Sequence, residues 1–289
     1  MSNAPNLTSL SGVRRILGER DLKPLKTLGQ NFLVDLNILN MIVRAADLRP
    51  GDAVLEIGAG LGVLTEALAA GGRRVVAVEK DLRLREHLES RFAGAASVEL
   101  VMADALEMDL DAMLASGLNK VVANLPYSAG SAILVNLLRA PNRPRRMVLT
   151  LQQEVARRLT AAPGSREFGL LGVWARLDYA VAIRKLVSPG CFYPAPKVKS
   201  AIVEFERLSA APCTEAERGF FYELTKAVFA HRRKQLKAIL AGMAEKRQAA
   251  APTSVLEALE ISPTARPETL DTAAWLHLAR ELRAALTVA

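Results

Sequence analysis

The sequence Asn-Leu-Pro-Tyr at residues 124–127 is the part of the chain best suited to chemistry. The side-chain oxygen of Asn124 and the carbonyl oxygen of Leu125 can accept the two N–H bonds of an aromatic amine such as the N6 amine of adenine. That amine is a poor nucleophile, because its lone pair is delocalised into the ring, and two acceptors would draw it toward tetrahedral geometry. Pro126 stiffens the turn, and the ring of Tyr127 can stack on a purine. The motif predicts attack of a purine amine on a methyl sulfonium, achieved by positioning and electrostatics without a strong base.

A second stretch predicts the site of the methyl donor. Glu56 is followed by glycines at positions 58, 60 and 62, between an apolar run and a helix-forming run. Glycines allow positive φ and let a ligand approach without meeting a Cβ. A dinucleotide site needs G-x-G-x-x-G, and Val63 stands where the third glycine should fall, which argues against NAD. The pattern resembles the first motif of methyltransferases that use S-adenosylmethionine, and a glycine turn without a ligand is the alternative interpretation.

Short apolar runs, several of which end in an acid or an amide, alternate with helical runs and predict a parallel sheet. The expected strands are 53–55, 74–78, 98–102, 120–123 and 146–151. Further strands at 179–186 and 201–205 are expected to complete the sheet as an antiparallel addition. The sequence therefore predicts an α/β fold whose functional strand ends collect on one edge.

Two of the acids at strand ends are candidates for ligand binding. Glu79 follows the second strand and Asp104 follows the third. In a doubly wound sheet a carboxylate leaving the second strand can accept both hydroxyls of a ribose, because that strand end lies beside the glycine turn. A solvated acid at a strand end is the alternative interpretation for Glu79.

The C-terminal part of the chain has a helical pattern that begins with a capping box at residues 214–217. Its basic run consists of Arg232, Arg233, Lys234 and Lys237. A charge run is usually a solvated helix surface, but no acid occurs from His231 to Ala244, which favours contact with phosphates. We expect a flexible lead-in at 1–23, an α/β domain at 24–208 and a small helical domain with a basic face at 209–289.

Composition limits the classes of partner. A net charge of +8 and a pI near 9.7 favour a polyanion such as nucleic acid, although a merely basic protein has the same charge. Two cysteines are too few for a disulfide framework, and three histidines show no metal-ligand spacing, so no metal is expected. The chain contains no apolar run of membrane-spanning length and does not begin with the features of a secretion signal. We therefore expect a cytoplasmic monomer without membrane contact.

Two aromatic residues, Phe192 and Tyr193, lie in a loop stiffened by Pro194 and Pro196. Aromatic rings held in a rigid loop can stack on a base, and capping of the hydrophobic core is an equally good interpretation.

Five motifs in order resemble the rRNA adenine N6-dimethyltransferase family. They are Leu-Gly-Gln-Asn-Phe-Leu at 28–33, the glycine turn after Glu56, Asn-Leu-Pro-Tyr at 124–127, Phe-x-Pro-x-Pro-Lys-Val at 192–198 and Arg-Arg-Lys at 232–234. The resemblance runs from Lys26 to the last helix. It implies a Rossmann-like S-adenosylmethionine-dependent methyltransferase sheet and a small all-helical C-terminal domain that binds RNA. The implied substrate is a pair of adjacent adenines in a hairpin loop near the 3′ end of 16S rRNA, each dimethylated within an immature 30S subunit, so that the enzyme would also serve small-subunit biogenesis.

The resemblance also implies roles for single residues. The cofactor contacts would be Asn31, Leu33, Gly58, Gly60, Glu79, Asp104 and Asn124, with Glu79 on the ribose and Asp104 on the adenine amine. The target base would be held by Asn124, Leu125, Pro126, Tyr127 and Phe192. The RNA contacts would be Arg232, Arg233, Lys234, Lys237 and Lys197. Residues 128–131 and Lys199 differ from the residues that are commoner in the family. These differences put the detailed contacts with RNA in doubt, but not methyl transfer.

Three alternatives remain open from the sequence. The 23S-directed antibiotic-resistance methyltransferases share the chemistry but differ in the opening motif and more often have Ile in the target turn. The basic run would also suit a ribosome-assembly binding factor without catalytic activity. A nicotinamide oxidoreductase is disfavoured by the glycine spacing and by the lack of a placed catalytic histidine.

Overall fold

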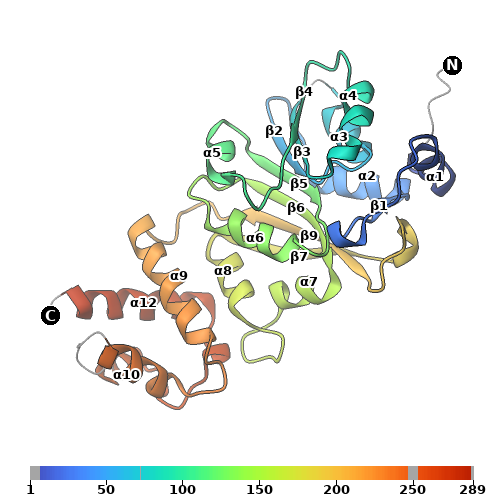
Figure 1. Ribbon diagram of the computed structural model, residues 1–289. Coiled ribbons are helices and arrows are strands. Elements are labelled where there is room, and N and C mark those ends of the chain that lie inside the picture. The colour runs from blue at the N-terminus through green and yellow to red at the C-terminus, as the bar shows by residue number, and fades with distance from the viewer. Residues whose placement is uncertain (1–6, 72, 247–252, 288–289) are drawn as a thin grey trace. The chain divides into compact units, whose positions relative to one another are not determined.

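The computed structural model describes residues 7–71, 73–246 and 253–287. The chain divides into two compact units (Figure 1). The first unit contains the described residues of Met1–Ala156 and Ala182–Arg207, and the second contains those of Arg157–Val181 and Leu208–Ala289. The domain predicted at 24–208 is therefore wrong for residues 157–181, which belong to the second unit. Their helix packs on the C-terminal helices, a long-range contact that no local pattern indicates.

A sheet of seven strands, counted among the described residues, organises the first unit. In spatial order the strands are β4 (Val98–Met102), β3 (Arg74–Glu79), β2 (Ala53–Ile57), β5 (Lys120–Asn124), β6 (Arg146–Gln152), β9 (Ser200–Arg207) and β7 (Tyr179–Val187). Neighbours from β4 to β6 are parallel, and β9 runs antiparallel to β6. The predicted parallel sheet and its antiparallel addition at 201–205 are thereby confirmed. Because β2, β3 and β5 are adjacent, the glycine turn, Glu79 and Asn124 reach the same edge.

Helices cover both faces of this sheet (Figure 1). On one side lie α1 (Leu10–Glu19), α2 (Leu36–Ala45), α3 (Val63–Ala69) and α4 (Arg85–Arg91), whose apolar residues share a core with alternate residues of the strands. Figure 1 shows α5 (Leu110–Ala115) and α6 (Gly130–Arg139) on the other side. The next helix, α7 (Gln153–Thr160), directly follows β6. This arrangement leaves the carboxyl ends of the strands uncovered for a ligand.

Helix α1 corrects the prediction of a flexible lead-in at 1–23. It begins after Ser9, whose hydroxyl accepts from the Gly12 amide at 3.2 Å. Its residues Val13, Ile16 and Leu17 are buried in the core of the first unit. Helical spacing of three apolar residues in a short, otherwise polar run is a weak signal, which explains the error. Residues 1–6 of the predicted lead-in lie outside the described residues.

A two-stranded sheet joins the opening motif to the aromatic loop. Strand β1 (Phe32–Leu33) runs antiparallel to β8 (Phe192–Tyr193), with Leu33 opposite Phe192. A short 3-10 helix, η1 (Lys26–Leu28), precedes β1, and another, η3 (Pro189–Cys191), precedes β8. The pairing brings together two motifs that the sequence analysis treated separately.

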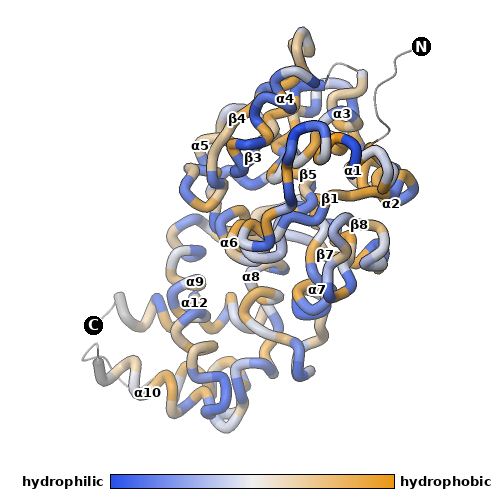
Figure 2. The backbone as a smooth tube through the Cα atoms, turned by 45° about the vertical axis from the view of Figure 1, so that its right-hand side comes forward, coloured by the Kyte–Doolittle hydropathy of each residue, from blue (hydrophilic) through white to orange (hydrophobic). Residues whose placement is uncertain are grey.

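The second unit is helical, as predicted for the C-terminal part of the chain. Its elements are α8 (Leu170–Asp178), α9 (Glu215–Phe229), α10 (Leu236–Lys246), α11 (Thr253–Ala258), the 3-10 helix η4 (Pro267–Thr269) and α12 (Thr272–Thr287). The predicted capping box is confirmed, because the Glu217 amide donates to the Thr214 hydroxyl while the Thr214 amide donates to the Glu217 carboxylate. Apolar and hydrophilic stretches alternate along α9 and α12 (Figure 2), as in amphipathic helices that share a core. None of the described helices is long and apolar enough to cross a membrane.

Candidate active site

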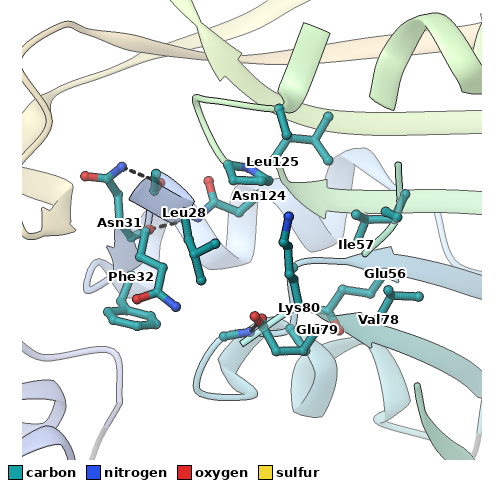
Figure 3. Close-up of a pocket in the computed structure, with 18 of the residues that line it drawn as sticks. Leu28, Asn31, Phe32, Glu56, Ile57, Val78, Glu79, Lys80, Asn124 and Leu125 are labelled. Atoms are coloured by element: carbon teal, nitrogen blue, oxygen red, sulfur yellow. Dashed lines mark hydrogen bonds between the residues drawn. The ribbon is translucent and has the colours of Figure 1, made fainter. Parts of the chain in front are cut away.

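A pocket lies in the first unit where β2, β3, β4 and β5 end (Figure 3). Its walls come from the opening motif, the glycine turn, the strand-end acids and the Asn-Leu-Pro-Tyr turn. The site residues from the sequence analysis that line it are Asn31, Leu33, Gly58, Gly60, Glu79, Asp104, Asn124, Leu125, Pro126 and Tyr127. The structure thus collects these residues around one space.

The glycine turn leaves room at the pocket floor. Gly58 has φ +87° and Gly60 has φ +58°, backbone conformations that other residues rarely adopt. A Cβ on Gly58 would lie 3.5 Å from the Asn124 carbonyl oxygen, in the space between the two motifs. A Cβ on Gly62 would instead lie 2.8 Å from the Phe92 ring, so this third glycine serves helix packing.

Glu79 fastens the glycine turn to the end of β3. Its Oε2 accepts from the Gly60 amide and its Oε1 from the Asp81 amide, both at 2.8 Å. Burial raises the pKa of this carboxyl, and the two amide bonds oppose the rise by stabilising the charged form. Each carboxylate oxygen can accept a further hydrogen bond, so Glu79 keeps the capacity predicted for it, acceptance of ribose hydroxyls.

Glu56 is the most unusual acid in the pocket wall. Its side chain is fully buried, and neither carboxylate oxygen forms a hydrogen bond of normal geometry among the described residues, although Thr65 lies near enough to lower the pKa in part. Burial raises the pKa of Glu56 to about 8, and the neighbouring Glu79 carboxylate adds to the rise. In the sequence, Glu56 serves only as a marker of the motif. A buried acid without a partner is costly and is best matched by a cationic ligand.

The orientation of Asn124 follows from its neighbour in the opening motif. The Asn124 Nδ2 donates to the Asn31 carbonyl oxygen at 3.1 Å, an interaction drawn as a dashed line in Figure 3. The amide oxygen Oδ1 is therefore the atom left to accept from a ligand. The Asn31 side chain donates to the Gly29 carbonyl oxygen at 2.9 Å and so stabilises its own turn. Through its carbonyl, Asn31 positions Asn124, a role that the sequence analysis missed.

Residues 25–31, termed the strap, form one wall of the pocket. Gln30 accepts from the Leu25 amide and donates to the Asp81 carboxylate, both at 2.8 Å. A Cβ on Gly29 would lie 2.9 Å from the Ser128 hydroxyl and 3.1 Å from the Tyr127 amide nitrogen. The strap is thus tied to Asp81, two residues after the end of β3, and is packed tightly on the Asn-Leu-Pro-Tyr turn at another point.

Asp104 is engaged at the end of β4. It forms an ion pair with Lys80, whose side chain is half exposed, and its Oδ1 accepts from the Leu106 amide at 3.0 Å. The hydrogen bond from Lys80 is the main cause that lowers the pKa of Asp104. A ligand amine would have to share this carboxylate with Lys80, and an exposed ion pair of this kind is worth little.

Phe192, which is predicted to contact the target base, is not among the residues that line the pocket. It is 3% exposed and packs in the core of the first unit, because its pairing with Leu33 turns it inward. Phe192 is therefore a core residue in this structure, and its contact with a target base stays a prediction. Tyr193 is partly exposed, and the Arg14 guanidinium lies 5.1 Å from the centre of its ring.

The basic run of the second unit lies mainly in a turn and not on a helix face. Arg232, Arg233 and Lys234 lie between α9 and α10, and Lys237 is in the first turn of α10. Arg232 is used by the fold, since it pairs with Glu268 and donates to the Arg166 carbonyl oxygen. The other three cations of the run are exposed and have no acidic partner among the described residues, as is also true of Lys197 in the first unit.

Comparisons with known proteins identify the family. A family model described as ribosomal RNA adenine dimethylase matches residues 22–278. The chain belongs to the ribosomal RNA adenine dimethylase family. As a member of this family it is an S-adenosylmethionine-dependent enzyme that dimethylates adenine in ribosomal RNA. The family also contains relatives that extend over nearly the whole chain.

Two curated relatives in the family are each called ribosomal RNA small subunit methyltransferase A. The protein from Geobacter metallireducens is 39% identical over 266 residues, which cover 91% of this chain and 97% of the relative. The protein from Chlamydia abortus is 40% identical over 268 residues, which cover 91% and 94%.

Two solved structures share the fold. A dimethyladenosine transferase from Plasmodium falciparum matches with a TM-score of 0.73 and 25% identity, over 87% of this chain and 97% of that chain. The 23S rRNA methyltransferase ErmE matches with a TM-score of 0.64 and 26% identity, over 88% and 100%. The family fold is therefore the one predicted from the strand and helix pattern.

The residues of the pocket fit the family's cofactor. S-adenosylmethionine carries a sulfonium and an ammonium group, and the unpartnered, buried carboxyl of Glu56 suits a cationic ligand. Because Gly58 has no Cβ, a ligand can approach its backbone in the space beside Asn124. Glu79 and Asp104 offer acceptors at two adjacent strand ends, which suits a ribose and an adenine amine. No cluster of three His, Cys, Asp or Glu side chains that could hold a metal ion occurs among the described residues.

Proposed function

We propose that this enzyme dimethylates the N6 amines of two adjacent adenines in the hairpin loop near the 3′ end of 16S rRNA. The substrate is the immature small ribosomal subunit, so the enzyme works in the cytoplasm and takes part in subunit biogenesis. We further propose that it acts as a monomer. The relatives named for the small-subunit rRNA are 39% and 40% identical and span nearly the full chain, whereas ErmE, named for 23S rRNA, is 26% identical. This relationship favours 16S over 23S rRNA.

The observation that carries the proposed chemistry is the fixed orientation of Asn124. Because Nδ2 donates to the Asn31 carbonyl, Oδ1 is presented to the pocket as an acceptor. The Leu125 carbonyl follows directly, beyond the last pair of the β5–β6 ladder, which joins Asn124 to Thr150. Two acceptors at adjacent positions match the two N–H bonds of an exocyclic adenine amine.

These two acceptors orient the nucleophile and do not act as a general base. Hydrogen bonds from the amine to Asn124 and Leu125 localise its lone pair and aim it at the methyl donor. S-adenosylmethionine supplies the methyl group on an already activated sulfonium. As the bond from nitrogen to the methyl carbon forms, the carbon–sulfur bond would break and S-adenosylhomocysteine would leave. The methylated amine would then be strongly acidic and would release its proton to water, so the chain needs no strong base. Tyr127 provides a flat surface that fixes the plane of the purine.

The remaining pocket residues hold the cofactor and bring the RNA. Glu79 receives the ribose hydroxyls, Asp104 the adenine amine, and Glu56 faces the cationic part of the ligand. In the second unit the exposed side chains of Arg233, Lys234 and Lys237 bind phosphates, and Lys197 adds a cation on the first unit. Binding to RNA is therefore expected to weaken steeply with salt.

The test is to map the methylated bases. Immature 30S subunits, free 16S rRNA and free 23S rRNA are each incubated with the enzyme and labelled S-adenosylmethionine, and the label is located by nuclease digestion and mass spectrometry. We expect two adjacent N6,N6-dimethyladenosines near the 3′ end of 16S rRNA and none in 23S rRNA. Label in 23S rRNA alone would support the antibiotic-resistance function, and binding of immature subunits without transfer would support a purely structural role.

A further inference from the structure

A buried serine lies at the end of the Tyr127 side chain. Ser200 is the first residue of β9 and is fully buried. Its hydroxyl forms a hydrogen bond with the phenolic hydroxyl of Tyr127. The two residues are 73 positions apart in the chain, so the contact is made by the fold and not by a local turn.

The sheet register brings Ser200 to the edge that carries the target turn. Antiparallel pairing places Ser200 opposite Gln152, at the carboxyl end of β6. The next strand, β5, ends at Asn124, which pairs with Thr150. Strand β9 therefore begins where the Asn-Leu-Pro-Tyr turn emerges. The backbone before Ser200 is held as well, because the Lys199 carbonyl accepts from the Gln153 amide at 2.9 Å.

The backbone of Tyr127 is fixed independently of its ring. The Pro126 carbonyl accepts from the Ala129 amide at 3.1 Å and from the Gly130 amide at 2.8 Å, which ties the turn to the start of α6. The strap packs against the Tyr127 amide, as the short distance to a Cβ on Gly29 shows. What remains free is rotation about the two side-chain torsions of Tyr127. A hydrogen bond at the far end of the ring restricts both torsions.

We propose that Ser200 is a positioning residue that sets the ring plane of Tyr127 for stacking on the target adenine. This role rests on the proposed function, because it needs a purine beside Tyr127. Ser200 touches neither the cofactor nor the reacting amine in this scheme. It acts on the rate of methyl transfer by keeping the purine in the plane in which its amine meets Asn124 and Leu125.

A purely structural role gives different expectations. The phenol of Tyr127 is partly buried, and its hydroxyl needs a partner whether or not a base stacks there. If Ser200 only satisfied this hydroxyl, its loss would lower the stability of the protein and leave the transfer rate of the folded enzyme unchanged.

The experiment is a double-mutant cycle on the full-length enzyme with 16S rRNA in immature subunits. The variants are Ser200→Ala, Tyr127→Phe and the double substitution, with Ser200→Thr as the conservative variant that keeps the hydroxyl. For each variant we measure kcat with both substrates saturating, the Kd for S-adenosylmethionine and the melting temperature. Tyr127→Phe tests the same hydrogen bond from the other side if Ser200→Ala folds poorly.

We expect Ser200→Ala and Tyr127→Phe each to lower kcat about tenfold, a loss in the range expected for one positioning hydrogen bond. The double variant should be no slower than either single variant, because both remove one interaction. Ser200→Thr should recover most of the rate, and the Kd for the cofactor should stay within about twofold throughout. Multiplying effects in the double variant, or an unchanged kcat in Ser200→Ala, would overturn the inference.

Failure of the proposed function would look different from failure of this inference. If the unsubstituted enzyme did not methylate 16S rRNA, the proposed function would fail and the role of Ser200 with it. If it did methylate 16S rRNA while the cycle showed independent effects, only the role of Ser200 would be wrong.

Discussion

Replacement of Glu56 by Gln should make the cofactor-free protein more stable at alkaline pH. The folded carboxyl has a pKa of about 8, against an ordinary value of 4.5 for a glutamate, because burial disfavours its charged form. Between these two values the folded state keeps a proton that the unfolded state has released, so stability falls as pH rises from about 4.5 to about 8. Below this window the raised pKa costs nothing. Above it the full cost applies.

The size of the effect follows from the two pKa values. At about 1.4 kcal/mol for each pKa unit, the charged carboxyl costs about 5 kcal/mol above pH 8 and about 3 kcal/mol at pH 7. Gln has nearly the same shape and no charge, so its own burial cost is independent of pH. The gain in stability of Glu56→Gln over the natural protein should therefore grow from nearly zero at pH 4.5 to several kcal/mol at pH 9.

Urea unfolding without cofactor, repeated from pH 5 to pH 9, measures this difference directly. Glu99→Gln is the control, because it removes an exposed carboxylate from the edge strand β4 of the same sheet and reports the effect of losing one surface charge. A stability difference between Glu56→Gln and the natural protein that stays constant across this range would refute the reasoning.

Three further predictions concern other parts of the molecule. Gly29→Ala should raise the KM for both substrates several-fold, because φ at Gly29 is +65° and the new Cβ would lie 2.9 Å from the Ser128 hydroxyl. Steady-state kinetics would measure this rise. Unchanged KM values would mean that the strap is not part of the site. If Asp104 accepts the cofactor's adenine amine, Lys80→Met should tighten cofactor binding about threefold, because the competing ion pair between Lys80 and Asp104 is lost. Calorimetry would measure the affinity, and weaker binding would contradict the assignment of Asp104. Arg218→Ala should destabilise the second unit by about 3–5 kcal/mol, because it removes the 2.5 Å ion pair between Arg218 and the buried Asp178 carboxylate. Thermal unfolding would measure this loss of stability. A melting temperature within about 2 °C of that of the natural protein would argue against the prediction.

The sheet edge was predictable from sequence because its signals are local. Each of the parallel strands β2 to β5 is largely a short apolar run, and glycines, an acid or an amide lie at its end or within two residues of it. Strand alternation with helices then fixes the parallel order closely enough to bring Gly58, Glu79 and Asn124 to one edge. The gathering of these residues at one edge could therefore be inferred without coordinates.

The features that escaped prediction depend on long-range contacts. Phe192 fits two interpretations in the sequence, and only its pairing with Leu33 decides that it is a core residue. Ser200 gives no signal at all, since its partner is set by the antiparallel register of β9 on β6. In the sequence Arg232 cannot be told from its basic neighbours. In the fold its guanidinium pairs with Glu268 and donates to the Arg166 carbonyl oxygen.

Glu56 shows a different limit of sequence reasoning. Its position before the glycines marks the motif, but the sequence does not reveal that the carboxyl is buried without a partner. Burial of a strand-end side chain depends on the helices that cover the sheet, and those contacts come from distant segments. The raised pKa is a consequence of this packing.

The central claim is that the side-chain oxygen of Asn124 accepts from the target amine, and single-turnover methyl transfer by Asn124→Ala tests it most directly. Asn142→Ala, in an exposed loop where Asn142 contacts Asp111, is the matched control. With saturating cofactor and immature 30S subunits, we predict transfer about 100–1,000-fold slower in Asn124→Ala, with the Kd for S-adenosylmethionine changed by less than about fivefold. Transfer at the natural rate by Asn124→Ala would contradict the account.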